Sequence, residues 1–136
     1  MDLMASMKIA AAGLKAQSGR MRVIAENLAN SNSTASKPGG EPYRRKIPTF
    51  TQQVNREIGL KTVSLGRIKL DQSEFGQRYE PGHPAADAKG YVEIPNVNAL
   101  IESMDMREAQ RSYEANLNVI GATRRMLART LEILRA

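Results

Sequence analysis

Apolar residues recur at alternating steps of three and four along residues 3–30, the spacing of one face of a long amphipathic helix. This main seam consists of Leu3, Met7, Ala10, Leu14, Gln17, Met21, Ile24 and Leu28. A second, small-residue seam on another side consists of Ala5, Ile9, Ala12, Ala16 and Val23. Gly13 and Gly19 each weaken a helix by about 1 kcal/mol relative to Ala. The pattern therefore predicts a helix that frays unless something packs on it.

A second long helix is predicted to run from about residue 96 to residue 134, with Asn96 or Asn98 as its N-cap. Glu102 and Asp105 then lie near the positive end of the helix dipole. The leucine seam of this helix consists of Leu117, Ile120, Leu127, Leu131 and Leu134. The Met126 seam, displaced around the helix, consists of Ala115, Val119, Ala122, Met126 and Ile133.

The segment between the helices has no helical period. Residues 31–42 combine Ser, Asn, Gly and Pro and predict a turn-rich linker. Residues 43–94 contain short, partly alternating runs broken by Gly and Pro, which predict a few short strands in a small hairpin-like sheet. Residues 79–90 predict a long irregular loop.

These patterns predict a mainly α fold in which long N- and C-terminal helices pair as an antiparallel, coiled-coil-like hairpin around a small middle segment that contains β-hairpins. The predicted segments are the N-terminal helix (1–34), the linker, short strands and loop (35–94), and the C-terminal helix (95–136). A two-helix hairpin covers only one seam on each helix, so the second seams require other chains. The alternative is that residues 43–94 cover them, although short strands broken by Gly and Pro are poor covers for long helices.

Asparagine occurs in both predicted helices. A buried amide in a helix seam fixes register and partner choice at a cost in stability, and we interpret Asn27 and Asn116 in this way. Asn32 is better explained as a residue that ends the first helix. The residues predicted to form the assembly seams are Leu3, Met7, Leu14, Met21, Ile24, Asn27, Leu28, Asn116, Leu117, Val119, Ile120, Met126, Leu127, Leu131 and Leu134.

Composition narrows the possible functions. The 136 residues include no Trp, two Phe and no Cys, which favours helix seams over an aromatic core and excludes disulfides and thiolate metal sites. The formal net charge of +6 leaves one alternative open, a basic helical nucleic-acid-binding protein that uses Arg20, Arg22, Arg44, Arg45 and Arg124. Because no aromatic residues interleave with the charges, we favour solvated helix faces and expect no nucleic-acid partner. No segment has the length of a membrane span, and we expect neither membrane insertion nor a cleaved signal peptide.

No pattern of catalytic residues is present. His83 is the only histidine and lies in the predicted loop, followed directly by Pro84. Gly39 and Gly40 lack the Lys-Ser/Thr of a phosphate-binding loop, and no Ser lies in a G-x-S-x-G motif. Methionines such as Met7 and Met126 fall on seams as adaptable filler. The sequence therefore predicts no enzyme, no metal site and no cofactor.

Two stretches are similar to known proteins. "AGLKAQSGRMRVIAENLANSNST" (12–34) resembles the N-terminal signature of the flagellar rod and hook family, in which a small-residue helix ends in N-L-A-N. "YEPGHPAADAKGYVEIPNVNALIESMDMREAQRSYEANLNVI" (79–120) resembles the proximal rod members of that family. Residues 43–75 match loosely.

The resemblance implies a structural subunit of the proximal rod of the bacterial flagellar basal body. Such a subunit polymerises through its terminal helices into the torque-transmitting drive shaft that spans the periplasm. The implied partners are copies of the chain, other proximal rod proteins, the rod-base adaptor of the MS ring, and the distal rod. The resemblance implies that the chain is exported unfolded by the flagellar type III apparatus. It also implies that the isolated subunit has low helicity and becomes ordered on assembly.

Overall fold

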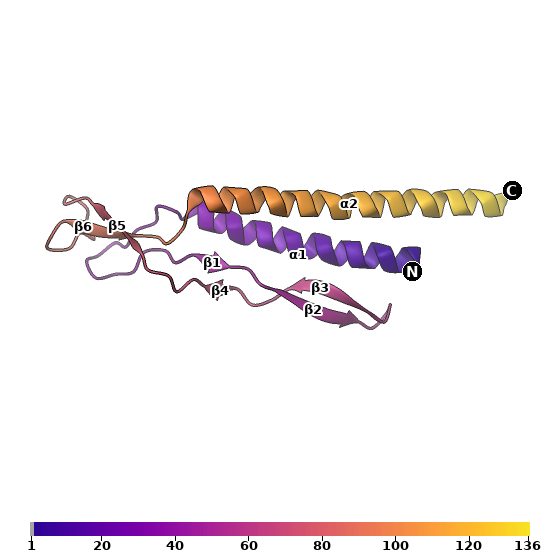
Figure 1. The fold of residues 1–136 in the computed structure, drawn as a ribbon, viewed down its shortest axis with the longest axis horizontal. Helices are drawn as coiled ribbons and strands as arrows, with labels where there is room; N and C mark the ends of the chain where they lie inside the picture. Colours follow the sequence, from indigo (N-terminus) through magenta and orange to yellow (C-terminus); the bar gives the residue numbers. More distant parts are fainter. Residues whose placement is uncertain (1) are drawn as a thin grey trace. The chain divides into compact units, whose positions relative to one another are not determined.

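A computed structural model describes residues 2–136, which form two long helices and, between them in the sequence, a segment of short strands (Figure 1). The elements in chain order are α1 (Leu3–Ala29), β1 (Lys46–Ile47), β2 (Phe50–Asn55), β3 (Leu60–Leu65), β4 (Lys69–Leu70), β5 (Gly76–Tyr79), β6 (Tyr91–Ile94) and α2 (Ala99–Arg135). The chain divides into two compact units. Unit 1 comprises the chain up to Met21, residues 49–67 and residues 107–136, and unit 2 comprises residues 22–48 and 68–106.

Both predicted helices are confirmed, with 27 residues in α1 and 37 in α2. The Asn98 side chain caps α2, because its Oδ1 accepts hydrogen bonds from the backbone N–H groups of Leu100 (3.0 Å) and Ile101 (3.3 Å). Asn96, the other candidate cap, lies before the helix and bonds elsewhere. The period-3.6 pattern therefore predicted the helix, and the structure selects Asn98 from the two candidate caps.

The middle segment contains β-hairpins, as predicted, but the prediction that its strands form a single small sheet is wrong. The strands form three separate antiparallel pairs, β1 with β4, β2 with β3, and β5 with β6. The longest pair joins Phe50 to Leu65 and Asn55 to Leu60 through a turn that closes at Gly59, whose φ is +65°. Pro48 separates β1 from β2, and Gly66 follows β3, so the backbone cannot continue one ladder into the next.

In unit 1, α1 packs against α2 with the two helices in opposite directions (Figure 1). A Cβ on Gly13 would lie 2.8 Å from Asn116 Oδ1, and Arg20 reaches Glu108 at 3.4 Å. As the residue number increases along α1, the number of the residue that it meets on α2 therefore decreases, as expected for antiparallel helices. By this order α1 begins opposite residue 126, and the last turns of α2 lie beyond it.

The β2–β3 hairpin also contacts α1 within unit 1. Lys8 forms an ion pair with Glu57 in the hairpin turn, and a Cβ on Gly19 would lie 2.8 Å from Leu65 Cδ2. The small-residue seam lies between this hairpin and α2, and its members Ala5 and Ala16 are buried. The sequence argument that short strands are poor covers was therefore wrong for α1, since the seam is narrow enough for one hairpin.

Unit 2 has a small apolar core in which Val23, Ile24 and Val92 are buried. The loop of residues 80–90 is attached to the linker through His83, whose Nε2 lies 3.0 Å from Thr34 Oγ1. His83 Nδ1 accepts the backbone N–H of Ala85 at 3.0 Å, so Nε2 carries the proton and donates to Thr34. The single histidine therefore has a structural role in this loop.

Candidate assembly surfaces

A buried polar cluster joins the end of α1 to β1 and to the start of α2 within unit 2. The Asn27 side chain has no exposed surface and makes all four hydrogen bonds that an amide allows. Nδ2 donates to Lys46 O (2.8 Å) and to Glu102 Oε2 (3.1 Å). Oδ1 accepts from the Tyr43 hydroxyl and from Lys46 N, both at 2.9 Å. The amide predicted to be buried is buried, and its partners are residues of its own chain.

Arg45 is the cationic centre of the same cluster. Its guanidinium donates to Glu102 Oε1 and lies 3.4 Å from Asp71 Oδ2 and 3.9 Å from Asp105 Oδ2. Burial alone would lower the pKa of Arg45, but the hydrogen bonds and charges of Glu102 and Asp71 outweigh it and raise that pKa. The Asn96 side chain accepts the Arg45 backbone N–H (2.8 Å) and donates to Asp71 O (3.0 Å). The cluster therefore leaves few polar groups without a partner.

Glu102 corrects one interpretation of the sequence. Its place in the first turn of α2 suggested a carboxylate that pairs with the helix dipole, but its side chain is 1% exposed and binds Asn27 and Arg45. A carboxylate on an exposed turn gains little from the dipole alone, whereas this one is the buried partner of a half-buried guanidinium whose other carboxylate neighbours, Asp71 and Asp105, are more exposed. Sequence spacing could not find the partners, because they lie 57 and 75 residues away.

Small and polar residues line the side of α2 that faces α1. Ala109, Asn116 and Thr123 recur every seven residues, and Ala109 and Thr123 are buried. Gly13 lies against Asn116 without a side chain of its own, which lets the two helices approach closely. Asn116 is half-buried at this line, and its Nδ2 donates to Ser112 O of its own helix. The line that α1 covers is thus neither of the two predicted seams of α2.

The two seams of α2 lie on either side of this covered line. At about 100° per residue, the leucine seam and the Met126 seam flank Asn116 and Thr123 in opposite directions. Exposed members are Leu117 (50%), Val119 (46%), Met126 (54%), Leu131 (62%), Ile133 (76%) and Leu134 (78%). Ile120 and Leu127 are half-buried. Within residues 107–136 an apolar surface therefore remains on both sides of the α1 contact.

The main seam of α1 is covered better than either seam of α2. Ile24 is buried, and the other large side chains predicted for assembly are half-buried: Leu3, Met7, Leu14, Met21 and Leu28. None of them has the exposure of Leu131 or Leu134. The apolar surface that remains is thus concentrated on α2.

Within residues 2–136, no group of three or more His, Asp or Glu side chains is arranged to hold a metal ion. No helix in the described part of the chain combines the length and the apolar character needed to cross a membrane. Of the arginines named for nucleic-acid binding, Arg45 is engaged with carboxylates, Arg20 pairs with Glu108, and Arg44 stacks on the Phe75 ring at 4.2 Å. The nucleic-acid alternative finds no support in these contacts.

Two family models match the ends of the chain, the "Flagella basal body rod protein" model over residues 7–35 and the "Flagellar basal body rod FlgEFG protein C-terminal" model over residues 88–133. Curated relatives match almost the whole length. The flagellar basal-body rod protein FlgC of Agrobacterium fabrum is 48% identical over 98% of this chain and 96% of its own length. FlgC of Escherichia coli O6:H1 is 41% identical over 98% of both chains, and FlgC of Bacillus subtilis 38% over 94% and 95%. This chain belongs to the FlgC family of flagellar basal-body rod proteins.

Membership in the FlgC family makes the chain a structural subunit of the flagellar basal-body rod, as the resemblance of residues 12–34 and 79–120 predicted. The two matched regions contain most of α1 and of α2, the helices on which the predicted seams lie. Residues 43–75, which resembled the family only loosely, contain the β2–β3 hairpin and Arg45. The FlgC relatives are rod proteins, and none of the three is named as an enzyme or a nucleic-acid-binding protein.

The polar cluster of this FlgC relative was missed at the sequence level. Arg45 was interpreted as part of a solvated face, yet Arg45 and its neighbours Tyr43 and Lys46 all bind the end of α1 or the start of α2. A signal did exist, because Asn27 and Glu102 are polar residues at core-facing helical positions and each therefore requires a partner. The sequence does not say which partner.

Proposed function

We propose that this chain is a proximal rod subunit that polymerises through α1 and α2 into the shaft that transmits torque. The single observation that carries the proposal is the apolar surface on both sides of the α1 contact of α2. Burying such side chains contributes about 25 cal/mol per Å² of apolar surface, which favours contact with further helices. Coiled-coil-like packing of the antiparallel helices is supported by the seven-residue spacing of Ala109, Asn116 and Thr123.

In this proposal the terminal segments, residues 1–34 and 95–136, form the inner tube of the rod, and residues 35–94 pack outside it. The predicted assembly residues that stay exposed or half-buried are assigned to contacts with neighbouring copies or with other rod proteins, except Asn116, which lies on the line that α1 covers, and Ile24 and Asn27, which are buried in their own chain. Asn27 would act indirectly, by fixing the position of α1 through the polar cluster, because its hydrogen bonds are already used. The further partners are the rod-base adaptor of the MS ring, the distal rod and the type III export apparatus.

The proposed location is the rod in the periplasm, reached by export of the unfolded chain without a cleaved signal. Gly13 and Gly19 in α1 and the exposed end of α2 make both helices easy to unfold for export. We expect the helical content of the isolated chain, measured by circular dichroism, to be below that of the assembled rod and to rise on assembly.

Imaging of purified basal bodies by electron microscopy, with this chain tagged, tests the proposal. The expected result is density for the tag along the proximal rod only. A tag found on the hook, or basal bodies that lack the chain, would contradict it. A monomer that is as helical at low concentration as in the rod would contradict the coupling of folding to assembly.

A further inference from the structure

Hairpin β5–β6 carries an exposed pair of tyrosines beside an open cavity in unit 2. The rings of Tyr79 and Tyr91 meet edge to face with centroids 5.3 Å apart. Tyr79 exposes 64% of its surface and Tyr91 exposes 42%. The cavity has a volume of about 270 Å³ and is lined by Ala35, Gly39, Gly40, Gln77, Ala85, Asp87, Tyr91, Val92 and Glu93. This is below the ~300–1,000 Å³ of sites for whole small ligands and suits a single long side chain.

The walls of this cavity are held in place. Gly90 has φ +86°, and a Cβ there would lie 3.0 Å from the Tyr79 ring and 3.2 Å from Pro81. Asp87 Oδ1 accepts the backbone N–H groups of Lys89 (2.8 Å) and Tyr91 (2.9 Å). The tyrosine pair is therefore exposed and also fixed, which lowers the entropy cost of binding.

The cavity has an acidic wall. Glu93 is exposed beside Gln77, its cross-strand neighbour, and forms no ion pair within residues 2–136. Hydrogen bonds from the backbone of Tyr91, with those of Lys89 and Gly90, lower the pKa of Asp87, so this carboxyl stays ionised near neutral pH. Two carboxylates and a tyrosine face are the groups that bind a guanidinium, through paired hydrogen bonds and cation–π contact.

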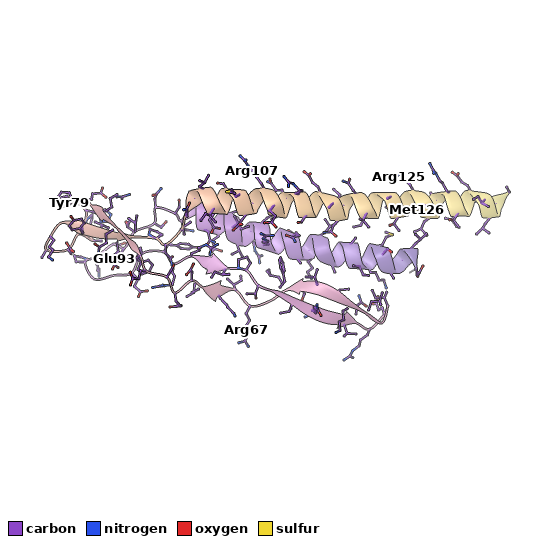
Figure 2. The ribbon with its side chains drawn as sticks, in the orientation of Figure 1. Arg67, Tyr79, Glu93, Arg107, Arg125 and Met126 are labelled. Carbon is purple, nitrogen blue, oxygen red and sulfur yellow. The ribbon has the colours of Figure 1, made fainter. Side chains whose placement is uncertain are left out.

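The charge of the chain is divided unevenly between its units. Unit 1 contains twelve Lys and Arg against five Asp and Glu, a net charge of +7, whereas unit 2 contains eight against nine, a net charge of −1. A stripe of four arginines lies on the side of α2 opposite the α1 contact: Arg107, Arg111, Arg125 and Arg129. Residues 18 apart are five full turns apart and share one side of a helix, and at about 100° per residue this side is about half a turn from the Ala109–Asn116–Thr123 line. Figure 2 shows Arg107 and Arg125 on this side of α2. All four are exposed, and none forms an ion pair in the described chain.

Arg125 is the member of this stripe whose charge is least compensated. No acidic residue lies within four positions of Arg125 in the sequence, whereas Asp105 and Glu108 lie that close to Arg107. Three of its four neighbours one turn away, Gly121, Ala122 and Ala128, are small and leave the guanidinium accessible, and the fourth, Arg129, carries a like charge that does not compensate it.

We propose that the Tyr79–Tyr91 cavity of one copy binds Arg125 of the next copy, with Asp87 and Glu93 as the anionic groups. Because the cavity and Arg125 are different surfaces of the same chain, the contact is head to tail, and such contacts build open polymers unless they close into a ring. This inference rests on the proposed assembly of copies into a rod. The proposed contact lies outside the apolar seams and adds an interaction between charged groups, which gives specificity for the correct neighbouring copy.

The test uses charge exchange in flagellated cells that produce this chain. We expect Glu93→Arg and Arg125→Glu each to reduce the amount of the chain in purified basal bodies about tenfold, and the double variant to recover to within about twofold of wild type. Arg107→Glu is the matched control on the same stripe and should leave incorporation unchanged. Glu93, Arg107 and Arg125 are all exposed, so the circular dichroism spectrum of each purified variant should equal that of wild type.

A second measurement identifies the occupant. The chain contains no cysteine, so Gln77→Cys, on the cavity wall beside Glu93, and Ala128→Cys, one turn from Arg125, give unambiguous sites for a short thiol-reactive linker and keep the proposed ion pair. Cross-links between copies are expected for this pair and not for Gln77→Cys with Gln110→Cys, which lies one turn from Arg107. Cross-links only to another rod protein, equal cross-linking of both pairs, or a double charge variant no better than the singles would overturn the inference. Absence of the wild-type chain from basal bodies would contradict the proposed function instead.

Discussion

The two helices differ in how far their own chain covers them. On α1, Ala5, Ala16 and Ile24 are buried, and the large residues of its main seam are half-buried. On α2, apolar residues such as Leu131 and Leu134 expose 62% and 78% of their surface. α1 consists of small residues on the side that meets α2 and the β2–β3 hairpin, whereas α2 offers α1 only a narrow line between two apolar seams. In the proposed rod, the small-residue surfaces make the contacts within one chain, and the wide apolar surfaces are left for neighbouring copies.

Among the substitutions that test this difference between the helices, Glu102→Leu should cause the largest loss of stability. The variant puts an apolar side chain of similar size in a buried site and removes one acceptor from the Arg45 guanidinium, which keeps Asp71, and one from the Asn27 amide, which keeps Lys46 O. Unit 2 should therefore lose about 3–5 kcal/mol. Amide exchange of residues 22–29 measures this loss. The control is Asp105→Asn, whose carboxylate lies 3.9 Å from Arg45 and is one-third exposed, and which should cost less than about 1 kcal/mol. Equal effects would show that the cluster does not hold α1.

Gly13→Val should open the contact between α1 and α2. A Cβ at Gly13 would lie 2.8 Å from the Asn116 amide, so the added side chain should cost about 2–3 kcal/mol, measured by amide exchange in α1. Gly121→Ala is the matched glycine on α2, where a Cβ would make an ordinary contact at 3.5 Å to Arg125 Nη1. That variant should stabilise the helix by up to about 1 kcal/mol. A stabilising Gly13→Val variant would contradict close approach of the helices.

Tyr43→Phe should cost about 1 kcal/mol at neutral pH, because the hydroxyl donates to Asn27 Oδ1. Burial, with the charges of Glu26 and Glu102, raises the pKa of Tyr43. The neutral phenol is therefore favoured by folding, and its contribution is present below the unfolded pKa of about 10 and lost as pH rises through the folded value. Denaturation curves at pH 7 and above pH 10 should differ more for wild type than for the variant. The reverse order would place the hydroxyl outside the cluster.

Leu131→Ser should have the smallest effect on the isolated chain, within about 0.5 kcal/mol, because its side chain is already exposed. The same variant should reduce the amount of chain in purified basal bodies about tenfold, since a seam that neighbours cover would lose its apolar surface. Glu132→Gln, on the adjacent exposed position, should change neither quantity. A loss of monomer stability without a loss of incorporation would assign Leu131 to the chain's own core.

The sequence predicted the elements well where local patterning decides them. Both helices, an asparagine cap at position 96 or 98 and the hairpin character of the middle segment follow from periodicity, capping residues and Gly or Pro breaks. The division into three separate strand pairs and the cover of α1 by β2–β3 depend on contacts distant in sequence, such as Lys8 with Glu57, which no local pattern encodes. The polar cluster was missed for the same reason. No local pattern identifies Tyr43, Arg45 and Asp71 as the residues that surround Asn27 and Glu102.

Amide hydrogen exchange of α2 in the isolated chain and in purified rods tests the central claim most directly. Residues 127–135 lie beyond the start of α1, so in the isolated chain they should exchange nearly as fast as an unfolded segment, while residues 22–29 near Asn27 stay protected. In the rod, residues 127–135 should become protected about a hundredfold or more, because neighbouring helices cover both seams. Equal exchange of residues 127–135 in the two samples would contradict the claim that the uncovered surface of α2 is what assembles the rod.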